Sequence, residues 1–452
     1  MSYSNIYFIG IGGIGMSAIA RYYKFKGCNV SGYDRTRTEL TDRLEAEGIS
    51  VHFEDRPELI PADKDNTLVV YTPAIPEDFG ELRFAIDRGY RVIKRSRILG
   101  EITAGQVCLA VAGTHGKTTT STLVAHILTE SGVGCSAFLG GISKNYGTNM
   151  LCDHSRTVVV EADEFDRSFH QLHPAISAIT AMDADHLDIY GDHAHVIEAF
   201  KIYASQVSET LILKLGLPIR KDEVSARIYT YHRDDPRADI HGSNIRLQSD
   251  GHYVFDLVYP GGVLSDIKVG ALGMVNVENS IAAAGICLCH GVDAQKIKHA
   301  IGSFEGARRR LDLHFNAGGM TYIDDYAHHP EELHSAISSV REIYPGRKLT
   351  GIFQPHLFTR TRDFAPEFAK SLSLLDKLIL LDIYPAREEP IKGVSSEIIF
   401  KDVTCPEMVL LDKEALMDYM QEEKVDVLMT LGAGNIDQFI EPLTLMLQNR
   451  LK

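Results

Sequence analysis

The chain has 452 residues, and its 61 acidic side chains outnumber the 46 lysines and arginines, which leaves a formal net charge of −15. With 44% apolar and 24% charged residues, the composition excludes a disordered chain, a collagen-like chain and a small module held by disulfides. The acidic balance also argues against a protein that coats nucleic acid or anionic membrane, because such binding needs a basic surface. At about 100–200 residues per domain, the length predicts two to four domains.

Seven cysteines are scattered along the chain, and only Cys287 and Cys289 lie close together. They do not form a zinc-binding set and are typical of small buried side chains in a reducing compartment. The first residues lack the pattern of a secretion signal, and no apolar run approaches the roughly 18 residues that span a bilayer. We therefore expect a cytoplasmic protein, either a monomer or a weak homodimer, with no nucleic-acid partner and no membrane partner.

Short β-branched runs alternate with amphipathic stretches, which is typical of parallel sheets with helices on both faces. In the first block, a strand at 5–9 leads through glycines into a helix over 16–26, and further strands are expected at 29–33, 67–72 and 90–93. The second block begins with an apolar strand at 107–112, a glycine turn and a helix over 118–130.

Two strands at 157–160 and 175–180 continue this second block, before a more antiparallel-looking stretch at roughly 228–270 and a helix over 276–289. A third block has predicted strands at 321–324, 348–353, 377–382, 408–411 and 425–431. The pattern predicts an α/β protein of three domains, 1–104, 105–304 and 305–452.

The glycines at 10, 12 and 15 follow the first strand and open a helix, and Asp34 lies 19 residues beyond the last of them. This spacing fits a dinucleotide-binding turn, in which glycines let the backbone approach a diphosphate and the acid meets a ribose hydroxyl. A turn that uses glycine only for packing is the simpler alternative. The loop alone does not distinguish NAD, FAD and a nucleotide sugar.

A second glycine turn, Gly113-Thr-His-Gly-Lys-Thr-Thr119, follows the strand at 107–112 and enters a helix. Backbone N–H groups at a helix N-terminus form an anion cradle, Lys117 can reach β- and γ-phosphates, and a threonine hydroxyl can hold Mg²⁺. The full phosphate-loop pattern needs glycine at 111, where this chain has Val111, so the turn is a shortened variant. His115 fits a spacer better than a catalyst.

Acidic clusters follow two later strands of the second block, at 161–166 and at 183–188. Ligands of open α/β sheets bind at the carboxyl ends of strands, so both clusters should face the phosphate loop. Mg²⁺ on a nucleotide needs one or two hard oxygens from the protein. The alternative is a solvated acidic loop.

Basic side chains gather in the third block, at 308–310 and at Arg360 and Arg362, and histidines stand near strand ends at 328, 329 and 356. Arginine forks match phosphate and carboxylate oxygens, although such groups are often only solvated surface.

In this order, the motifs resemble those of the Mur ligases along essentially the whole chain. The markers are GIGGIGMS (10–17), AGTHGKTT (112–119), EADE (161–164), DADH (183–186), NVEN (276–279), DDYAHHP (324–330), QPHLFTRTR (354–362) and GAGN (432–435). The resemblance implies an N-terminal Rossmann-like domain for a UDP-sugar, a central P-loop ATPase whose mostly parallel sheet has a small antiparallel part, and a C-terminal Rossmann-like domain for an amino acid.

The implied reaction joins L-alanine to the lactyl carboxylate of UDP-N-acetylmuramate through an acyl phosphate, with ATP and Mg²⁺ (or Mn²⁺), in peptidoglycan precursor synthesis. By the same resemblance, the UDP-sugar residues are Gly12, Gly13, Ile14, Gly15, Asp34, Thr72, Ala74, Lys94 and Ser96. The ATP residues are Gly113, Thr114, His115, Gly116, Lys117, Thr118, Thr119, Asn276, Asn279, Arg309, Arg310 and Asp325.

The metal residues implied by the resemblance are Thr118, Glu161 and His186, and the amino-acid residues are Tyr326, His328, His356 and Arg360. Lys117, His328 and Arg360 are the implied catalytic set. Two departures stand out, because many relatives have histidine in place of Val275 and arginine in place of Leu357.

Three alternatives remain open at this point. A ligase that adds a preformed tripeptide to the same UDP-sugar shares the donor site and differs in the amine. A nicotinamide dehydrogenase leaves the second phosphate loop unexplained. A nucleotide-switched binding protein needs no sugar-nucleotide site.

Overall fold

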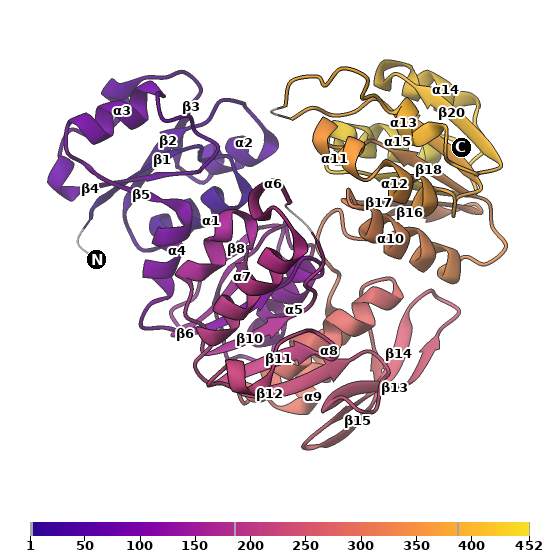
Figure 1. Cartoon of the computed structure of the whole chain (residues 1–452), viewed down its shortest axis with the longest axis horizontal. Coiled ribbons are helices and arrows are strands. Elements are labelled where there is room, and N and C mark those ends of the chain that lie inside the picture. The colour runs from indigo at the N-terminus through magenta and orange to yellow at the C-terminus, as the bar shows by residue number, and fades with distance from the viewer. Residues whose placement is uncertain (1–2, 185–186, 387, 452) are drawn as a thin grey trace. The chain divides into compact units, whose positions relative to one another are not determined.

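The structure is a computed structural model that describes residues 3–184, 187–386 and 388–451. Within these ranges the strands form three sheets, of five, ten and six strands, with helices against each (Figure 1). No helix in the described ranges is both long and apolar enough to cross a bilayer. The chain divides into two compact units: Met1–Asn244 with Phe255–Lys268 and Glu278–Glu305, and Ile245–Val254 with Val269–Val277 and Gly306–Lys452.

The first sheet is parallel and has the order β3-β2-β1-β4-β5. Alternate side chains of its central strand point to opposite faces: Ile6 and Phe8 share a core with α1, whereas Tyr7 and Ile9 pack with α3. The strand order reverses at β1, and ligands of such sheets bind beside the carboxyl end of that strand. The elements are β1 (Asn5–Ile9), α1 (Ile14–Phe25), β2 (Asn29–Tyr33), α2 (Glu39–Ala46), β3 (Ser50–His52), β4 (Thr67–Tyr71), α3 (Gly80–Asp87), β5 (Arg91–Lys94) and α4 (Arg95–Thr103).

The second sheet has the order β15-β14-β13-β12-β11-β10-β6-β9-β7-β8. Within it, β6 pairs parallel with β9 and β10. The strands are β6 (Val107–Ala112), β7 (Ser136–Phe138), β8 (Met150–Leu151), β9 (Thr157–Ala162), β10 (Ile176–Ile179), β11 (Thr210–Lys214), β12 (Arg227–His232), β13 (Ile240–Leu247), β14 (Tyr253–Tyr259) and β15 (Gly262–Lys268). Its helices are α5 (Lys117–Glu130), α6 (Leu187–Tyr190), α7 (His193–Ser205), α8 (Met274–Cys289) and α9 (Ala294–Ser303).

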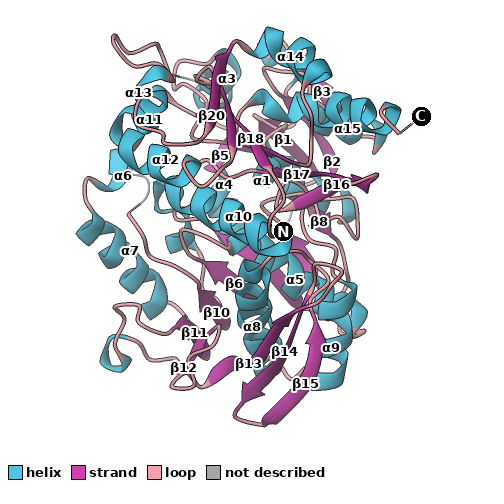
Figure 2. Cartoon of the chain, turned by 90° about the vertical axis from the view of Figure 1, so that its right-hand side faces the viewer, coloured by secondary structure: helices cyan, strands magenta, loops and turns pink. Residues whose placement is uncertain are grey.

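Antiparallel pairing is confined to the edges of this second sheet among the described residues. β7 and β8 pair antiparallel at one edge. At the other edge β13, β14 and β15 lie side by side (Figure 2), and two residues join β14 to β15, too few for the crossover that parallel neighbours need. The predicted antiparallel stretch is therefore right for β13–β15 and wrong for β12, which pairs parallel with β11 and β13.

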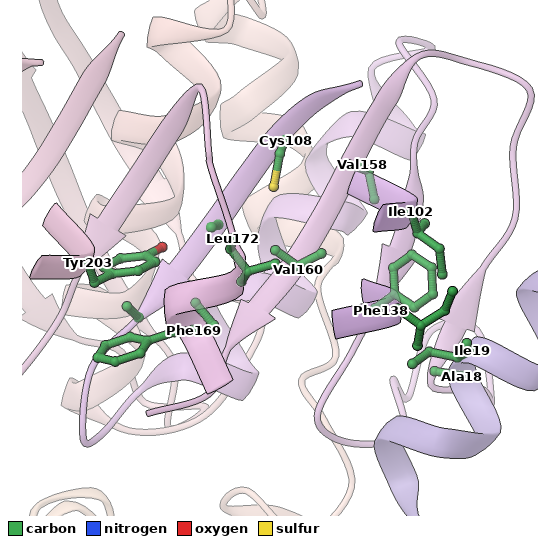
Figure 3. Packing of buried hydrophobic residues seen from close by; sticks show 14 of the residues in the cluster. Ala18, Ile19, Ile102, Cys108, Phe138, Val158, Val160, Phe169, Leu172 and Tyr203 are labelled. Atoms are coloured by element: carbon green, nitrogen blue, oxygen red, sulfur yellow. The ribbon is translucent and has the colours of Figure 1, made fainter. Parts of the chain in front are cut away.

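The first two sheets share one hydrophobic core. Figure 3 shows Ile19 of α1 and Ile102 of α4 beside Phe138 of β7, and all three side chains are buried. The same cluster continues to Val158 and Val160 of β9 and on to Phe169. This continuous apolar contact explains why both sheets belong to one compact unit.

The third sheet has the order β16-β17-β21-β18-β19-β20, and β16 with β17 is its antiparallel pair in the described part of the chain. Two buried clusters lie on its two faces. The strands are β16 (Asp312–Ala317), β17 (Met320–Asp325), β18 (Leu349–Phe353), β19 (Lys377–Leu381), β20 (Glu407–Leu411) and β21 (Val427–Leu431). The helices are α10 (Pro330–Ile343), α11 (Phe358–Asp363), α12 (Ala365–Leu372), α13 (Glu397–Phe400), α14 (Leu416–Glu422) and α15 (Ile440–Asn449).

Short 3₁₀ helices complete the description: η1 (Pro57–Leu59), η2 (Lys64–Asn66), η3 (Phe165–Gln171), η4 (Lys221–Glu223), η5 (Lys413–Ala415) and η6 (Asn435–Phe439). The predicted fold class is confirmed: an α/β protein of three sheets, the central one mostly parallel with a small antiparallel part.

Candidate active site

The first glycine turn begins where β1 ends. The amides of Gly10 and Ile11 donate to the carbonyl of Tyr33, at 2.8 and 2.9 Å, and Gly10 has a φ of 89° that favours glycine. The amide of Gly12 donates to the carboxylate of Asp34 at 2.7 Å, and a Cβ at Gly12 would lie 2.8 Å from that carboxylate. Asp34 thus closes the turn itself, in addition to any contact with a ribose.

The other residues predicted for the UDP-sugar lie around the same end of the first sheet. Gly13 caps α1 and Ile14 begins it, with 37% of the Ile14 side chain exposed. Thr72 and Ala74 follow β4, Lys94 ends β5, and Ser96 is the second residue of α4. A Cβ at Gly10 would lie 2.7 Å from Thr72, so the loops after β1 and β4 are in contact.

The second glycine turn joins β6 to α5. Gly113 and Gly116 have φ values of 141° and 80°, and Gly116 caps the helix. A Cβ at Gly113 would clash with the hydroxyl of Thr180, which itself donates to the carbonyl of His115. The turn therefore needs glycine for both its backbone angles and its space, and its amides stand at the N-terminus of a 14-residue helix.

Lys117 is the first residue of α5, and its ammonium group is held on two sides. Nζ donates to the carbonyl of Gly113 at 2.6 Å and to both carboxylate oxygens of Glu164 at 2.7 Å. Burial disfavours the ammonium charge, but the negative charge of Glu164 and its acidic neighbours outweighs it and raises the pKa of Lys117. Lys117 is thus a fixed cation inside the loop.

The acidic segment after β9, residues 161–166, connects to both glycine turns. Glu161 accepts hydrogen bonds from the Thr118 hydroxyl at 3.2 Å and from the Gly140 amide at 3.1 Å. Asp163 accepts from Arg95 at 3.0 Å. Asp166 lies 4.0 Å from the Lys94 ammonium, and Glu164 holds Lys117 as described. Its carboxylates therefore face groups of both the first and the second sheet.

Asp183, the first residue of the second predicted acidic cluster, lies beside the same phosphate loop. Thr114 donates through its hydroxyl to the carboxylate of Asp183 at 3.2 Å, and His115 Nε2 lies 3.5 Å from that carboxylate. His186, predicted as a metal ligand, lies outside the described residues. In the described ranges no group of three or more His, Cys, Asp and Glu residues has the geometry of a metal site. The Thr118 hydroxyl and the Glu161 carboxylate nevertheless offer adjacent hard oxygens, which fits Mg²⁺.

The two asparagines predicted to read adenine sit three residues apart on α8, and both are buried. The Asn279 carbonyl oxygen accepts from the Thr120 hydroxyl at 3.3 Å and lies 2.9 Å from the position of a Cβ at Gly116. Asn279 is thus brought to the phosphate loop. The Asn276 side chain donates to the carbonyl of Leu272 at 2.6 Å.

In the second compact unit, the Arg309 side chain forms hydrogen bonds with neighbouring residues. Its Nε donates to the buried carboxylate of Asp324 at 3.0 Å, and Nη2 donates to the carbonyl of Gly432 at 2.6 Å. The guanidinium groups of Arg309 and Arg310 lie 5.1 and 5.3 Å from the ring centre of Tyr326. These contacts give Arg309 a structural role, whatever it binds besides.

The Asp325 side chain is also hydrogen-bonded to the nearby backbone. Its carboxylate accepts from the amides of Leu311 at 2.7 Å and Ala327 at 2.8 Å. Burial raises the pKa of Asp325 to about 6, although Arg310 and these amides favour the ionised form. The carboxylate supports the turn at 309–311, in which Arg309 and Leu311 have positive φ values.

The residues predicted for the amino acid come together at the ends of β17 and β18. The ring of His328 lies 5.2 Å from that of Tyr326 and 6.0 Å from that of His356, and His356 stacks on Tyr384 at 5.8 Å. Burial lowers the pKa of His328 to about 4, against the opposing effect of Glu332, and the charge of Arg360 acts in the same direction as burial. His328 is therefore neutral near pH 7, as an acceptor for an amine proton must be.

Two residues of this site, Arg95 and Glu164, were absent from the predicted set. Glu164 belongs to the EADE marker and to the acidic cluster at 161–166, which was expected to face the phosphate loop. Arg95 stands between the predicted Lys94 and Ser96, but its contact with Asp163 joins residues 68 positions apart. Tyr384, which stacks on His356, likewise follows a different strand.

Comparison with known families gives three consecutive matches. The model of the Mur ligase family catalytic domain matches residues 5–106, the Mur ligase middle domain matches 111–287, and the Mur ligase glutamate ligase domain matches 309–434. A UDP-N-acetylmuramate–L-alanine ligase from Parabacteroides distasonis is 50% identical over 99% of this chain and 98% of its own length. One from Porphyromonas gingivalis is 49% identical, over 98% of this chain and 99% of its own.

Solved structures agree with these matches. MurC, a UDP-N-acetylmuramate–alanine ligase from Thermotoga maritima, has a TM-score of 0.83 and 25% identity, and the match covers 99% of both chains. A murein peptide ligase from Psychrobacter arcticus shares the fold with a TM-score of 0.70 at 21% identity over 99% of both chains. The matches to these ligases extend over nearly the full length of the chain. The chain therefore belongs to the Mur ligase family.

Proposed function

We propose that this protein is an ATP-dependent ligase that joins L-alanine to the lactyl carboxylate of UDP-N-acetylmuramate. The products are UDP-N-acetylmuramoyl-L-alanine, ADP and phosphate. The observation that carries the proposal is the identity of 47–50% over nearly the whole chain to several proteins named for this reaction. The geometry supports it, because two glycine turns suited to diphosphate and triphosphate lie in one compact unit and share one acidic segment.

The chemistry has two steps. In the first, a lactyl carboxylate oxygen attacks the γ-phosphorus of ATP, the bond to ADP breaks, and an acyl phosphate forms. In the second, the amine of L-alanine attacks the acyl carbon, phosphate leaves with the bonding electrons, and the amine loses a proton. Such transfers depend on positioning and charge neutralisation more than on covalent help from the protein.

We assign the ATP phosphates to the turn at 113–119. The amides at the start of α5 would surround the β- and γ-phosphates, with Lys117 beside them. Asn279 next to the turn, with Asn276 on the same helix, would bind adenine. Arg309, Arg310 and Asp325 complete the proposed ATP set, with Arg309 and Asp325 also supporting their own loop.

The Thr118 hydroxyl and the Glu161 carboxylate would hold Mg²⁺, with His186 as a further candidate. The ion would supply positive charge for the phosphate oxygens during transfer. Glu161 is kept in place by the Gly140 amide, and a Cβ at Gly140 would collide with this carboxylate. Glycine at 140 thus allows Glu161 to reach Thr118.

For L-alanine we propose the group Tyr326, His328, His356 and Arg360. A zwitterion needs a cation for its carboxylate, which Arg360 offers, and an acceptor for the amine proton. Neutral His328 meets the second need, and the carbonyl of Tyr326 and the carboxylate of Glu332 face its Nδ1 at 3.0 and 3.2 Å. If Nδ1 carries the proton, Nε2 is left as the accepting atom.

The division of labour follows the three sheets. We propose that residues 1–104 bind the UDP-sugar, 105–304 bind ATP and 305–452 bind the amino acid. ATP and UDP-sugars are metabolites of the cytoplasm, so we place the reaction there and assign it to peptidoglycan precursor synthesis.

Phosphate release from ATP tests this function. With UDP-N-acetylmuramate present, L-alanine should stimulate release far above buffer, above glycine and above a murein tripeptide. Stimulation by the tripeptide instead would indicate the recycling ligase. Release that ignores all amines would indicate a nucleotide-switched protein, and either result would overturn the proposal.

A further inference from the structure

Arg95, the first residue of α4, lies between the first glycine turn and the acidic segment that follows β9. Its Nη2 donates to the carboxylate of Asp163 at 3.0 Å, and only 21% of its side chain is exposed. On its other side, a Cβ at Gly15 would lie 2.5 Å from Nη1, closer than any real Cβ contact. The backbone of Gly15 does not have a positive φ, so its backbone angles do not require glycine, and the guanidinium occupies the space that a side chain at this position would take.

The guanidinium has donors to spare. An arginine side chain carries five N–H donors, and within the described ranges the bond to Asp163 is the hydrogen bond found for Arg95. Next to it, α1 begins without a side-chain cap at Gly13 and without an acidic residue in its first turn. Free amides of a helix N-terminus and a guanidinium with free donors therefore face the same region, where an anion is favoured.

We propose that Arg95 binds an anionic group of the sugar nucleotide directly, and that Asp163 is a positioning residue that aims the guanidinium. This inference rests on the proposed function for the identity of the ligand. The anionic group is the diphosphate or the lactyl carboxylate, which share the chemistry that an arginine fork recognises. Gly15, the third glycine of the turn, would then leave room for the Arg95 guanidinium and also let the backbone approach the substrate.

The residue next to Asp163 holds a cation of the ATP turn. This residue is Glu164, and the cation is Lys117. One short segment thus orients one cation for each nucleotide. Lys94 near Asp166 is less fixed, with 51% of its side chain exposed and a separation of 4.0 Å.

Calorimetric titration of the full-length protein tests the proposal with UDP-N-acetylmuramate and, separately, with a non-hydrolysable ATP analogue. Arg95→Ala should weaken UDP-N-acetylmuramate binding by about 10- to 100-fold, the effect of losing a charged hydrogen bond, and leave the ATP analogue within about twofold. The affinity of Arg95→Lys for UDP-N-acetylmuramate should lie between those of the wild type and Arg95→Ala, because an ammonium group keeps the charge but cannot form the planar fork. Arg97→Ala is the matched control, since Arg97 is 67% exposed on the same helix and lies near Glu101.

Two experiments distinguish ligand binding by Arg95 from a purely structural contact between Arg95 and Asp163. One is the variant Asp163→Asn, and the other is rescue of Arg95→Ala by an added guanidinium compound. If Asp163 only aims the guanidinium, Asp163→Asn should cost less than Arg95→Ala, and added methylguanidinium should restore binding to Arg95→Ala. Equal losses of both ligands in the two variants, with no rescue, would show a structural bridge and overturn the proposal, as would unchanged binding in Arg95→Ala. Titration with UDP alone assigns the contact: a matching loss indicates the diphosphate, and no loss indicates the lactyl carboxylate. Wild-type protein that fails to bind UDP-N-acetylmuramate would instead overturn the proposed function.

Discussion

The ammonium group of Lys117 lies 2.7 Å from both carboxylate oxygens of Glu164, and 14% of the Lys117 side chain and 2% of the Glu164 side chain are exposed. The pair forms at the start of α5, so the same contact fixes the phosphate loop and neutralises the buried carboxylate of Glu164. Its two roles, in stability and in catalysis, can be separated by mutation.

Lys117→Ala should reduce turnover by at least about 100-fold, the effect of losing a preorganised charge at a transferring group. It should also lower the free energy of unfolding by about 3–5 kcal/mol, because it removes the cation that neutralises the buried Glu164 carboxylate. Adding Glu164→Gln should recover much of the stability and none of the turnover. Thermal melts and phosphate release measure the two effects, and a double variant as unstable as the single one would contradict the account.

The neighbouring glycines of the first turn should differ in tolerance. A Cβ at Gly12 would lie 2.8 Å from both Asp34 and Thr41, whereas at Gly13 the nearest atom is 3.7 Å away. Gly12→Ala should therefore raise KM for UDP-N-acetylmuramate by more than about tenfold, and Gly13→Ala by less than about threefold. Steady-state kinetics at saturating ATP decide this, and equal effects would argue against the close contact with Asp34.

Glu161→Gln should increase the Mg²⁺ concentration needed for half-maximal activity by about tenfold or more, because an amide oxygen is a weaker ligand for a hard cation. Glu198→Gln on the exposed face of α7 is the control and should leave the metal requirement unchanged. A Mg²⁺ titration of phosphate release provides the measurement. An unchanged requirement in Glu161→Gln would remove Glu161 from the metal site.

His328 predicts a pH-dependent stability. Its pKa is about 4 in the folded protein and 6.5 in an unfolded chain, so between these values the unfolded state binds more protons and stability rises with pH. Fully expressed, the difference is at most about 3 kcal/mol. Asp325, with its pKa raised to about 6, acts in the opposite direction between about pH 4 and 6. The prediction therefore concerns the difference between variants.

His328→Gln should flatten the stability profile between pH 4 and 6.5 relative to wild type, as measured by urea unfolding. The control His173→Gln changes an exposed histidine in the segment before β10 and should leave the profile as it is. Parallel profiles for wild type and His328→Gln would contradict the lowered pKa.

Much of the fold could be predicted from sequence where apolar runs end at glycines or acids. β1, β2 and β6 have the predicted bounds, because a glycine or an aspartate follows each strand directly, and β1 and β6 are also buried on both faces of their parallel sheets. β16 (Asp312–Ala317) was not predicted, although the alternation of its polar residues Asp312, His314 and Asn316 with apolar ones is typical of a half-buried edge strand. β12 was placed in an antiparallel stretch because nothing local distinguishes its parallel partners.

The site divides in the same way. The glycine turns and Lys117 could be predicted because their function requires residue types at fixed local spacing. The pairing of Arg95 with Asp163 and the closing of the Gly12 turn by Asp34 are tertiary contacts, which spacing does not encode. The sequence likewise suggested that Asp325 binds ATP, but it could not predict that two backbone amides donate hydrogen bonds to the Asp325 carboxylate.

The apolar contact of Ile19 and Ile102 with Phe138 limits how the protein can be cut. A fragment starting near residue 105 would present Phe138 and its neighbours to water, and the complementary fragment would expose α1 and α4. Neither fragment should stay monomeric when expressed alone. The domain proposed to bind the sugar nucleotide therefore cannot be exchanged as an independent unit. Swapping it between relatives would require carrying the matching face of β7 and β9 with it.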